Sequence, residues 1–311
     1  MEATWRWTLI TAIAPVAWGS NYYVTREFLP ADAALWGAAI RALPAGLLLL
    51  LVARARPRGA WWWRSALLGA MNVGAFFALI YLAAQRLPTS IASTIMAASP
   101  IALMLMAWAI VAERPRLIPL TGAAIGISGV AIMLLGGGGT IDPLGVAASV
   151  TAMLMSAAGY VLAKRWSGEV ELLASTSWQL VAGGLLLLVP ALLLEGAPPA
   201  LDAQATLGFA YVTVIATAVA FVAWFGGLSH LPASTVGLIG LLNPVTGVLL
   251  GTVLAGELLS ARQALGIALV LAGILVGRAK RRVSRVVARP VASAAASACQ
   301  SAMPAPGSSR R

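Results

Sequence analysis

Residues 87–129, LPTSIASTIMAASPIALMLMAWAIVAERPRLIPLTGAAIGISG, recur at residues 231–273 as LPASTVGLIGLLNPVTGVLLGTVLAGELLSARQALGIALVLAG. The second copy follows the first at a shift of 144 residues without a gap. The recurring positions include prolines, glycines and a glutamate: Leu87-Pro88 with Leu231-Pro232, Ser90 with Ser234, Pro100 with Pro244, Glu113 with Glu257, Gly122 with Gly266, and Gly129 with Gly273. Apolar helices do not align by chance at so many such positions in one frame, so the sequence contains an internal duplication.

A weaker match extends the duplication toward the N-terminus at a shift of 138 residues. The matched pairs are Arg26 with Lys164, Arg41 with Gln179, and Gly46 with Gly184. The duplicated unit therefore covers nearly half of the chain.

The composition is that of a membrane protein. Of the 311 residues 60% are apolar and 10% are charged, and the mean hydropathy is +0.90. A soluble domain carries about 25% charged residues. A helix that crosses the hydrocarbon core needs about 20 apolar residues, and helices satisfy their own backbone hydrogen bonds there. The predicted spans are residues 8–25, 33–53, 65–84, 88–110, 117–136, 143–163, 172–194, 204–226, 233–255 and 263–278.

Each copy of the duplication holds five predicted spans. Because five is odd, the second copy enters the membrane with the opposite polarity. The predicted fold is an all-α membrane protein of ten transmembrane helices, arranged as two inverted five-helix repeats at residues 8–136 and 143–278. Inverted repeats are typical of transporters, whose substrate site lies near the middle of the membrane between the halves.

The distribution of Lys and Arg predicts the orientation. With the N-terminus in the cytoplasm, the outer loops hold only Arg26, Arg86 and Arg262, and most other bases are cytoplasmic. This is the asymmetry expected of an inner-membrane protein, and it places both termini in the cytoplasm. The apolar run continues past Trp18, so the first span is expected to be an uncleaved helix rather than a signal peptide.

Residues 279–311 form a basic tail that is expected to be disordered and cytoplasmic. Its bases are not interleaved with aromatic residues that would stack on nucleobases, so membrane lipid is the expected partner and nucleic acid is not. The chain has one cysteine, Cys299, and one histidine, His230. These counts leave no basis for a disulfide, a metal site or another cofactor.

The sequence resembles the drug/metabolite transporter superfamily, in particular its EamA-type members. The resemblance rests on Trp18-Gly19-Ser20-Asn21 and on the duplicated Leu-Pro…Pro…Glu…Gly pattern, and it covers roughly residues 8–278. It implies ten spans around a central cavity that opens alternately to each side. It also implies that spans five and ten are peripheral, where the dimeric members of the family pack, so the chain is a monomer or a homodimer. In general character the sequence is similar to bacterial exporters of amino acids and neutral metabolites.

Two prolines at matched positions predict helix kinks. Pro100 and Pro244 lie inside spans four and nine, and each frees the carbonyl of the residue four positions earlier, Met96 or Gly240. Ser99 and Asn243 precede the prolines. These groups are candidates for binding a substrate ammonium or hydroxyl group, although kinks of this kind also occur as plain packing features.

Aromatic residues provide further candidates, because rings with one polar edge suit a cavity for amphipathic solutes. Packing against lipid is the alternative at each position. The candidates are Trp18, Tyr22, Phe77, Tyr81, Tyr160, Phe221 and Trp224. Asn21 joins them because an amide that faces lipid is costly.

Arg41 is the only base well inside a span, and an intramembrane charge is a functional hypothesis by default. It is a candidate for binding a substrate carboxylate, or it reaches the outer interface or the backbone. Glu113 and Glu257 end spans four and nine. They are expected either to act in gating or in contacts between the halves, or to anchor loops by pairing, Glu113 with Arg114 or Arg116 and Glu257 with Arg262.

No Asp or Glu lies in the central region of a predicted span, which is where proton-driven pumps usually place a carboxylate. The sequence therefore favours facilitated export of amino acids or similar neutral, zwitterionic metabolites without proton coupling. Multidrug or metabolite efflux by proton antiport is the first alternative. A non-transporting membrane assembly protein is the second. An enzyme is not expected, since the spans hold no titratable pair or metal ligands.

Overall fold

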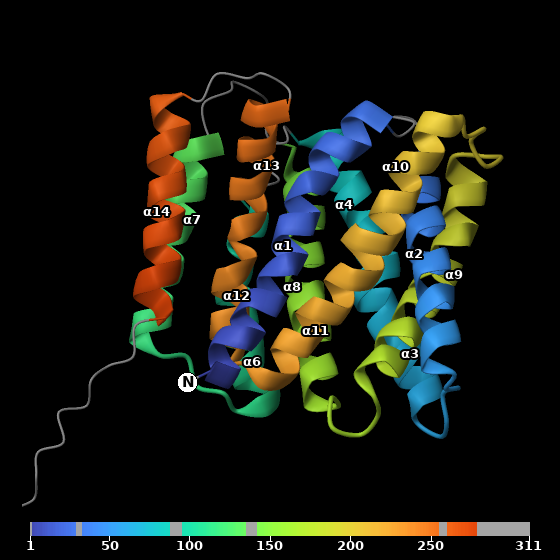
Figure 1. Ribbon diagram of the computed structural model, residues 1–311, viewed down its shortest axis with the longest axis horizontal. Coiled ribbons are helices and arrows are strands. Elements are labelled where there is room, and N and C mark those ends of the chain that lie inside the picture. The colour runs from blue at the N-terminus through green and yellow to red at the C-terminus, as the bar shows by residue number, and fades with distance from the viewer. Residues whose placement is uncertain (1, 29–32, 88–94, 135–141, 255–259, 279–311) are drawn as a thin grey trace, which may run out of the picture. The chain divides into compact units, whose positions relative to one another are not determined.

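The computed structural model describes residues 2–28, 33–87, 95–134, 142–254 and 260–278, and these form helices and their connections with no strand among them (Figure 1). The elements of the first part are α1 (Glu2–Phe28), α2 (Ala34–Ala53), α3 (Trp61–Gly69), η1 (Ala70–Gly74), α4 (Ala75–Arg86), α6 (Ser99–Val111) and α7 (Leu117–Leu134). The elements of the second part are α8 (Pro143–Arg165), α9 (Leu172–Leu194), α10 (Ala203–Thr213), η2 (Val214–Val219), α11 (Ala220–His230), α12 (Ala233–Gly240), α13 (Leu242–Leu254) and α14 (Ala261–Arg278).

Six of the described helical segments are long and apolar enough to cross a membrane: Ala34–Ala53, Trp61–Ala83, Pro143–Arg165, Leu172–Leu194, Ala203–His230 and Ala233–Leu250. Shorter apolar helices cover Ser99–Val111, Leu117–Ile132 and Ala261–Gly277. The chain is therefore an all-helical membrane protein with several spans. Parts of three predicted spans, at residues 88–94, 135–136 and 255, lie outside the described residues, as do Glu257 and the tail at residues 279–311.

The helix ends follow local rules. Asp142 accepts a hydrogen bond from the Leu144 N–H at 2.8 Å and so caps α8, whose first residue is Pro143. Arg86 donates to the other oxygen of Asp142 at 3.0 Å, and this hydrogen bond holds the pKa of the Asp142 carboxyl below its ordinary value. At the opposite end of the molecule Ala112 adopts a left-handed conformation, with φ of 56°, and ends α6.

Both predicted proline kinks lie next to breaks in the helical path. The helix is interrupted at Ala98, so that Pro100 falls in the first turn of α6, and it is interrupted again at Leu241, between α12 and α13. At each break an amide donates three residues back, from Ala98 to Ile95 at 3.0 Å and from Leu241 to Leu238 at 3.2 Å. A proline is tolerated in a first turn because its missing N–H would have no helical partner there.

Glycines bring neighbouring helices into backbone contact, as in the pair α7 with α14 and the pair α2 with α9. In the pair α7 and α14 (Figure 1), a Cβ on Gly122 would lie 2.5 Å from the carbonyl oxygen of Gly273, and a Cβ on Gly129 would lie 2.7 Å from that of Gly266. The order of the contacts reverses along the two helices, so they run antiparallel. Small residues at such crossings let helices approach closely in a membrane.

The pair α2 and α9 is built in the same way. A Cβ on Gly46 would lie 2.6 Å from the amide nitrogen of Val181, and a Cβ on Gly184 would lie 2.9 Å from that of Leu43. Because the contacting atoms belong to the backbone, neither helix can yield by a side-chain rotation.

Gly122→Ala is expected to lower the melting temperature of the purified protein in detergent. The added methyl would also lie 2.5 Å from the Cα of Gly277, so α7 and α14 must separate, at a cost of about 1–3 kcal/mol. Gly168→Ala is the matched control, because a Cβ there meets nothing within 4 Å. Equal melting temperatures for the two variants would contradict the tight crossing.

Candidate functional site

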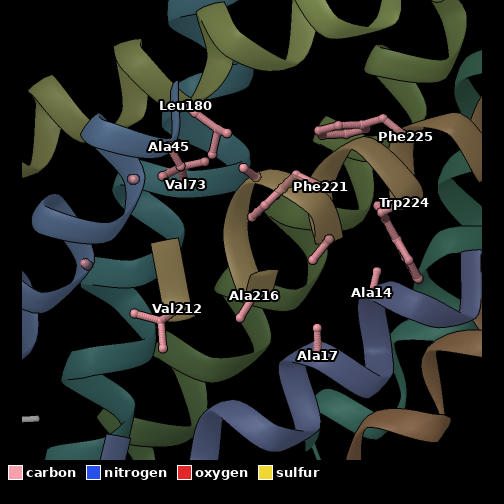
Figure 2. Close-up of a cluster of buried hydrophobic side chains, with 14 of the residues drawn as sticks. Ala14, Ala17, Ala45, Val73, Leu180, Val212, Ala216, Phe221, Trp224 and Phe225 are labelled. Carbon is pink, nitrogen blue, oxygen red and sulfur yellow. The ribbon is translucent and has the colours of Figure 1, made fainter. Parts of the chain in front are cut away.

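Five aromatic side chains from three helices form one cluster between α1, α8 and α11. The Trp224 ring lies 5.2 Å from the ring of Trp18 and 5.6 Å from that of Tyr160. Phe221 and Phe225 complete the cluster, with ring centroids 5.8 Å apart. Figure 2 shows Phe221, Trp224 and Phe225 on α11, where all three are buried. The fold thus assembles four of the predicted aromatic candidates with Phe225 in a single place.

Two π-helical segments lie beside this cluster. The segment η1 starts at Ala70 and η2 starts at Val214, which are equivalent positions at the 144-residue shift of the duplication. Trp18 donates its indole N–H to the carbonyl of Ala216 in η2 at 3.1 Å. Thr217 donates to the carbonyl of Val212 at 2.7 Å, five residues back along the same helix. Short π-helical segments are frequent at functional sites.

Arg41 is buried and reaches from α2 to η2. Its Nε donates to the hydroxyl of Thr217 at 3.1 Å, and its guanidinium carbon lies 4.9 Å from the ring centroid of Phe77. Among the described residues no carboxylate lies within 4 Å of this cation. The interior location of Arg41 was predicted, and the hydroxyl and the ring that contact it were not.

Gln179 of α9 makes the equivalent contact in the other half. It corresponds to Arg41 at the 138-residue shift, and it accepts a hydrogen bond from Asn72 of η1 at 3.0 Å. Asn72 and Gln179 are both buried, and Gln179 also donates to the carbonyl of Ser175 at 3.1 Å. Each half therefore sends one long polar side chain to the π-helical segment of the other.

Several polar atoms of the candidate site are buried without a hydrogen-bond partner among the described residues. They are the amide oxygens of Asn21, Asn72 and Asn243 and the indole nitrogen of Trp224. A Cβ on Gly19 of α1 would lie 2.5 Å from the backbone carbonyl oxygen of Asn243 in α13. The two helices therefore cross in close contact at Asn243, the residue before Pro244. Buried polar groups without partners are unusual and require an explanation, such as a bound solute.

The remaining predicted residues occupy the surroundings of the cluster. Phe77, Tyr81 and Met96 are half-buried and pack against the same core. Ser99 is half-buried at the start of α6. The side chain of Tyr22 lies outside the described ones.

A cavity of about 360 Å³ lies between α8, α9 and α11 and reaches Phe225 of the aromatic cluster. Its polar lining residues are Ser167, Ser175, Gln179, Ser229 and His230. Sequence reasoning did not single out this group as a site, although the repeat had marked Gln179 as the partner of Arg41.

Comparison with known proteins settles the family. The model of the EamA-like transporter family matches residues 5–135 and 143–277. The chain belongs to the EamA-like transporter family. The resemblance that the sequence carries at Trp18-Gly19-Ser20-Asn21 and in the duplicated motif is thus confirmed.

This EamA-like transporter has relatives along most of its length. It is 33% identical to protein PecM of Dickeya dadantii (strain 3937) over 259 residues. This alignment covers 83% of this chain and 87% of PecM. It is 27% identical over 260 residues to the uncharacterized inner membrane transporter YedA of Escherichia coli (strain K12), over 82% and 85% of the two chains. A solved crystal structure of a protein has the same fold, with a TM-score of 0.76, 20% sequence identity, and 88% and 96% of the two chains covered. The family and the name of YedA indicate a multi-span membrane transporter.

Proposed function

We propose that this EamA-like transporter exports amino acids and similar small neutral or zwitterionic metabolites across the inner membrane by alternating access. Ten spans form two inverted five-helix repeats, at residues 8–136 and 143–278, and the substrate binds between them. Both termini are cytoplasmic, and the driving force is the substrate gradient without proton coupling.

The observation that carries this proposal is the two-fold relation among the helix contacts. At the shift of 144 residues Gly122 becomes Gly266 and Gly129 becomes Gly273, so the contact of Gly122 with Gly273 becomes that of Gly129 with Gly266. Swapping the equivalent residues of the two repeats therefore maps the α7–α14 contact onto itself, as a two-fold axis would. Since the two helices run antiparallel, an axis that relates them lies in the membrane plane, as in inverted-repeat transporters.

Other helix contacts also occur in equivalent pairs in the two repeats. At the shift of 138 residues the contact of Gly46 with Val181 becomes that of Gly184 with Leu43. The helix α1 packs against α11 and α13, and its counterpart α8 packs against α4 and α6. The equivalent π-helical segments and their contacts to Arg41 and Gln179 extend the relation to the polar groups.

The groups near the aromatic cluster support a zwitterionic substrate. Arg41 lacks a carboxylate partner among the described residues, so its guanidinium can bind the carboxylate of an amino acid. Asn21 and Asn243 provide acceptors for an ammonium group, and the rings of Trp18, Tyr160 and Trp224 provide a surface for an apolar side chain.

Exchange of a labelled neutral amino acid in sealed liposomes is expected to proceed at the same rate with and without an imposed pH gradient. The reason is that no predicted span holds an Asp or Glu in its central region to carry a proton. The measurement pairs uptake of the label with a pH-sensitive dye inside the liposomes. A proton flux that accompanies the substrate would contradict uncoupled exchange and favour antiport.

A further inference from the structure

An ion pair joins the two halves at the end of the molecule where α6 and α8 finish, the side we propose is cytoplasmic. Lys164, near the end of α8, lies 2.7 Å from a carboxylate oxygen of Glu113, which follows α6. Lys164 also donates to the carbonyl of Leu231 at 2.9 Å. Of the two expectations for Glu113, the contact between the halves is confirmed and the pairing with Arg114 or Arg116 is wrong, because the folded chain brings Lys164 and an uncapped helix start to this carboxylate.

The second carboxylate oxygen of Glu113 binds the start of α12. It accepts a hydrogen bond from the Ala233 N–H at 2.9 Å, where Pro232 offers no side-chain cap of its own. A carboxylate is favourable at a helix N-terminus because of the free N–H groups and the helix dipole. One side chain of the first half thus holds both α8 and the turn between α11 and α12.

The residues next to this ion pair on α11 and α12 belong to the core that contains the aromatic cluster. Leu228, Leu231 and Val236 are buried and belong to the same core as Trp224 and Phe225. Farther along α12, Gly237 packs against the backbone of Pro100 in α6, with 3.0 Å from its added Cβ to the Pro100 Cα. The two half-helices next to the breaks at Ala98 and Leu241 are therefore held together at this end.

We propose that the pair of Lys164 and Glu113 is the lock that keeps this transporter closed at this end, and that it must separate before the cluster opens to that side. The proposal rests on the proposed alternating access. The side chains of Lys164 and Glu113 retain 20% and 29% exposure, so both charges can rehydrate when the lock opens. A fully buried pair would leave unpaired charges in the protein interior and would hold the gate shut.

The lock is tested by the accessibility of a residue beneath it. Cys299 is the only cysteine, so Cys299→Ser with Val236→Cys provides a single reporter thiol, and Leu228→Cys provides a second position. The full chain is labelled with a maleimide from the cytoplasmic side in inside-out vesicles. Labelling of the reporter is expected to be slow when the lock is intact.

Glu113→Gln and Lys164→Gln are each expected to raise the labelling rate by about tenfold or more, because losing the pair shifts the population toward the open state. Lys164→Arg keeps the charge and the donors and is expected to stay within about threefold of the intact lock. Glu169→Gln is the matched control, since it breaks another ion pair between the two parts of the chain, that with Arg64, at the same end.

Unchanged labelling in both glutamine variants, with folded protein shown by a single gel-filtration peak, would overturn the proposal. An equal rise in Glu169→Gln would overturn it as well, since it would indicate general loosening of this end. Labelling needs no substrate, so its result stands apart from the proposed function: a chain that moves no amino acid can still have this lock, and an active exchanger can lack it.

Discussion

Arg41→Gln is expected to reduce the exchange of neutral amino acids by about tenfold to a hundredfold. A hydrogen bond to a charged group contributes about 1.5–3 kcal/mol, and every 1.4 kcal/mol corresponds to about tenfold in affinity. Glutamine is a suitable replacement, because the chain itself has Gln179 at the equivalent position of the second half. The loss is measured as counterflow in liposomes and is expected in KM more than in the amount of folded protein.

The control for Arg41→Gln is a substrate without a carboxylate. Amino-acid amides are expected to be exchanged slowly by the wild type and equally slowly by the variant, since they offer no anion to Arg41. Thr217→Val, which removes the hydroxyl that holds the guanidinium, is expected to give a smaller loss in the same direction. An equal fractional loss for amino acids and their amides would assign Arg41 to packing between α2 and η2 instead.

Asn243→Leu is expected to leave the protein at least as stable as the wild type while it reduces exchange by about tenfold. The amide oxygen of Asn243 is buried without a partner among the described residues, and replacing such a group by an apolar one of similar shape is neutral or stabilising. If this oxygen binds the substrate, transport falls although the melting temperature does not. This opposite response separates a binding role from a structural one.

Asn72→Leu is the comparison for Asn243→Leu. Asn72 also has an unpartnered oxygen, but its amide nitrogen donates to Gln179 at 3.0 Å, so the substitution removes a partner and is expected to lower the melting temperature. Normal exchange by Asn243→Leu would contradict the role of Asn243 in binding. Its oxygen would then be only a buried polar atom without a hydrogen bond among the described residues.

Much of the helical framework was predictable, because each apolar run has one backbone solution in lipid. The predicted span at 143–163 is α8, which covers Pro143–Arg165, and the one at 172–194 is α9, which covers Leu172–Leu194. The breaks at Ala98 and Leu241 were predicted only as kinks. A proline removes one hydrogen bond, and whether a helix bends or stops there depends on the neighbouring helices.

The candidate site was predictable in its residue types and not in its contacts. Polar and aromatic side chains inside a span are candidates for a functional site, and this rule identifies Arg41, Trp18 and Trp224. The π-helical segments had no signal in the sequence, because one extra residue per turn changes neither the composition nor the hydropathy. The contacts of Arg41 with Thr217 and of Lys164 with Glu113 join residues that are distant in sequence, so they required the fold.

The most direct test of the central claim is counterflow with the purified full chain in liposomes loaded with unlabelled threonine, methionine or an aromatic amino acid. We expect saturable accumulation of the labelled amino acid that rises above its equilibrium level and then decays, with Arg41→Gln greatly reducing the overshoot. Absence of an overshoot for every amino acid in the panel, with dyes or other metabolites exchanged instead, would contradict the proposed substrate class.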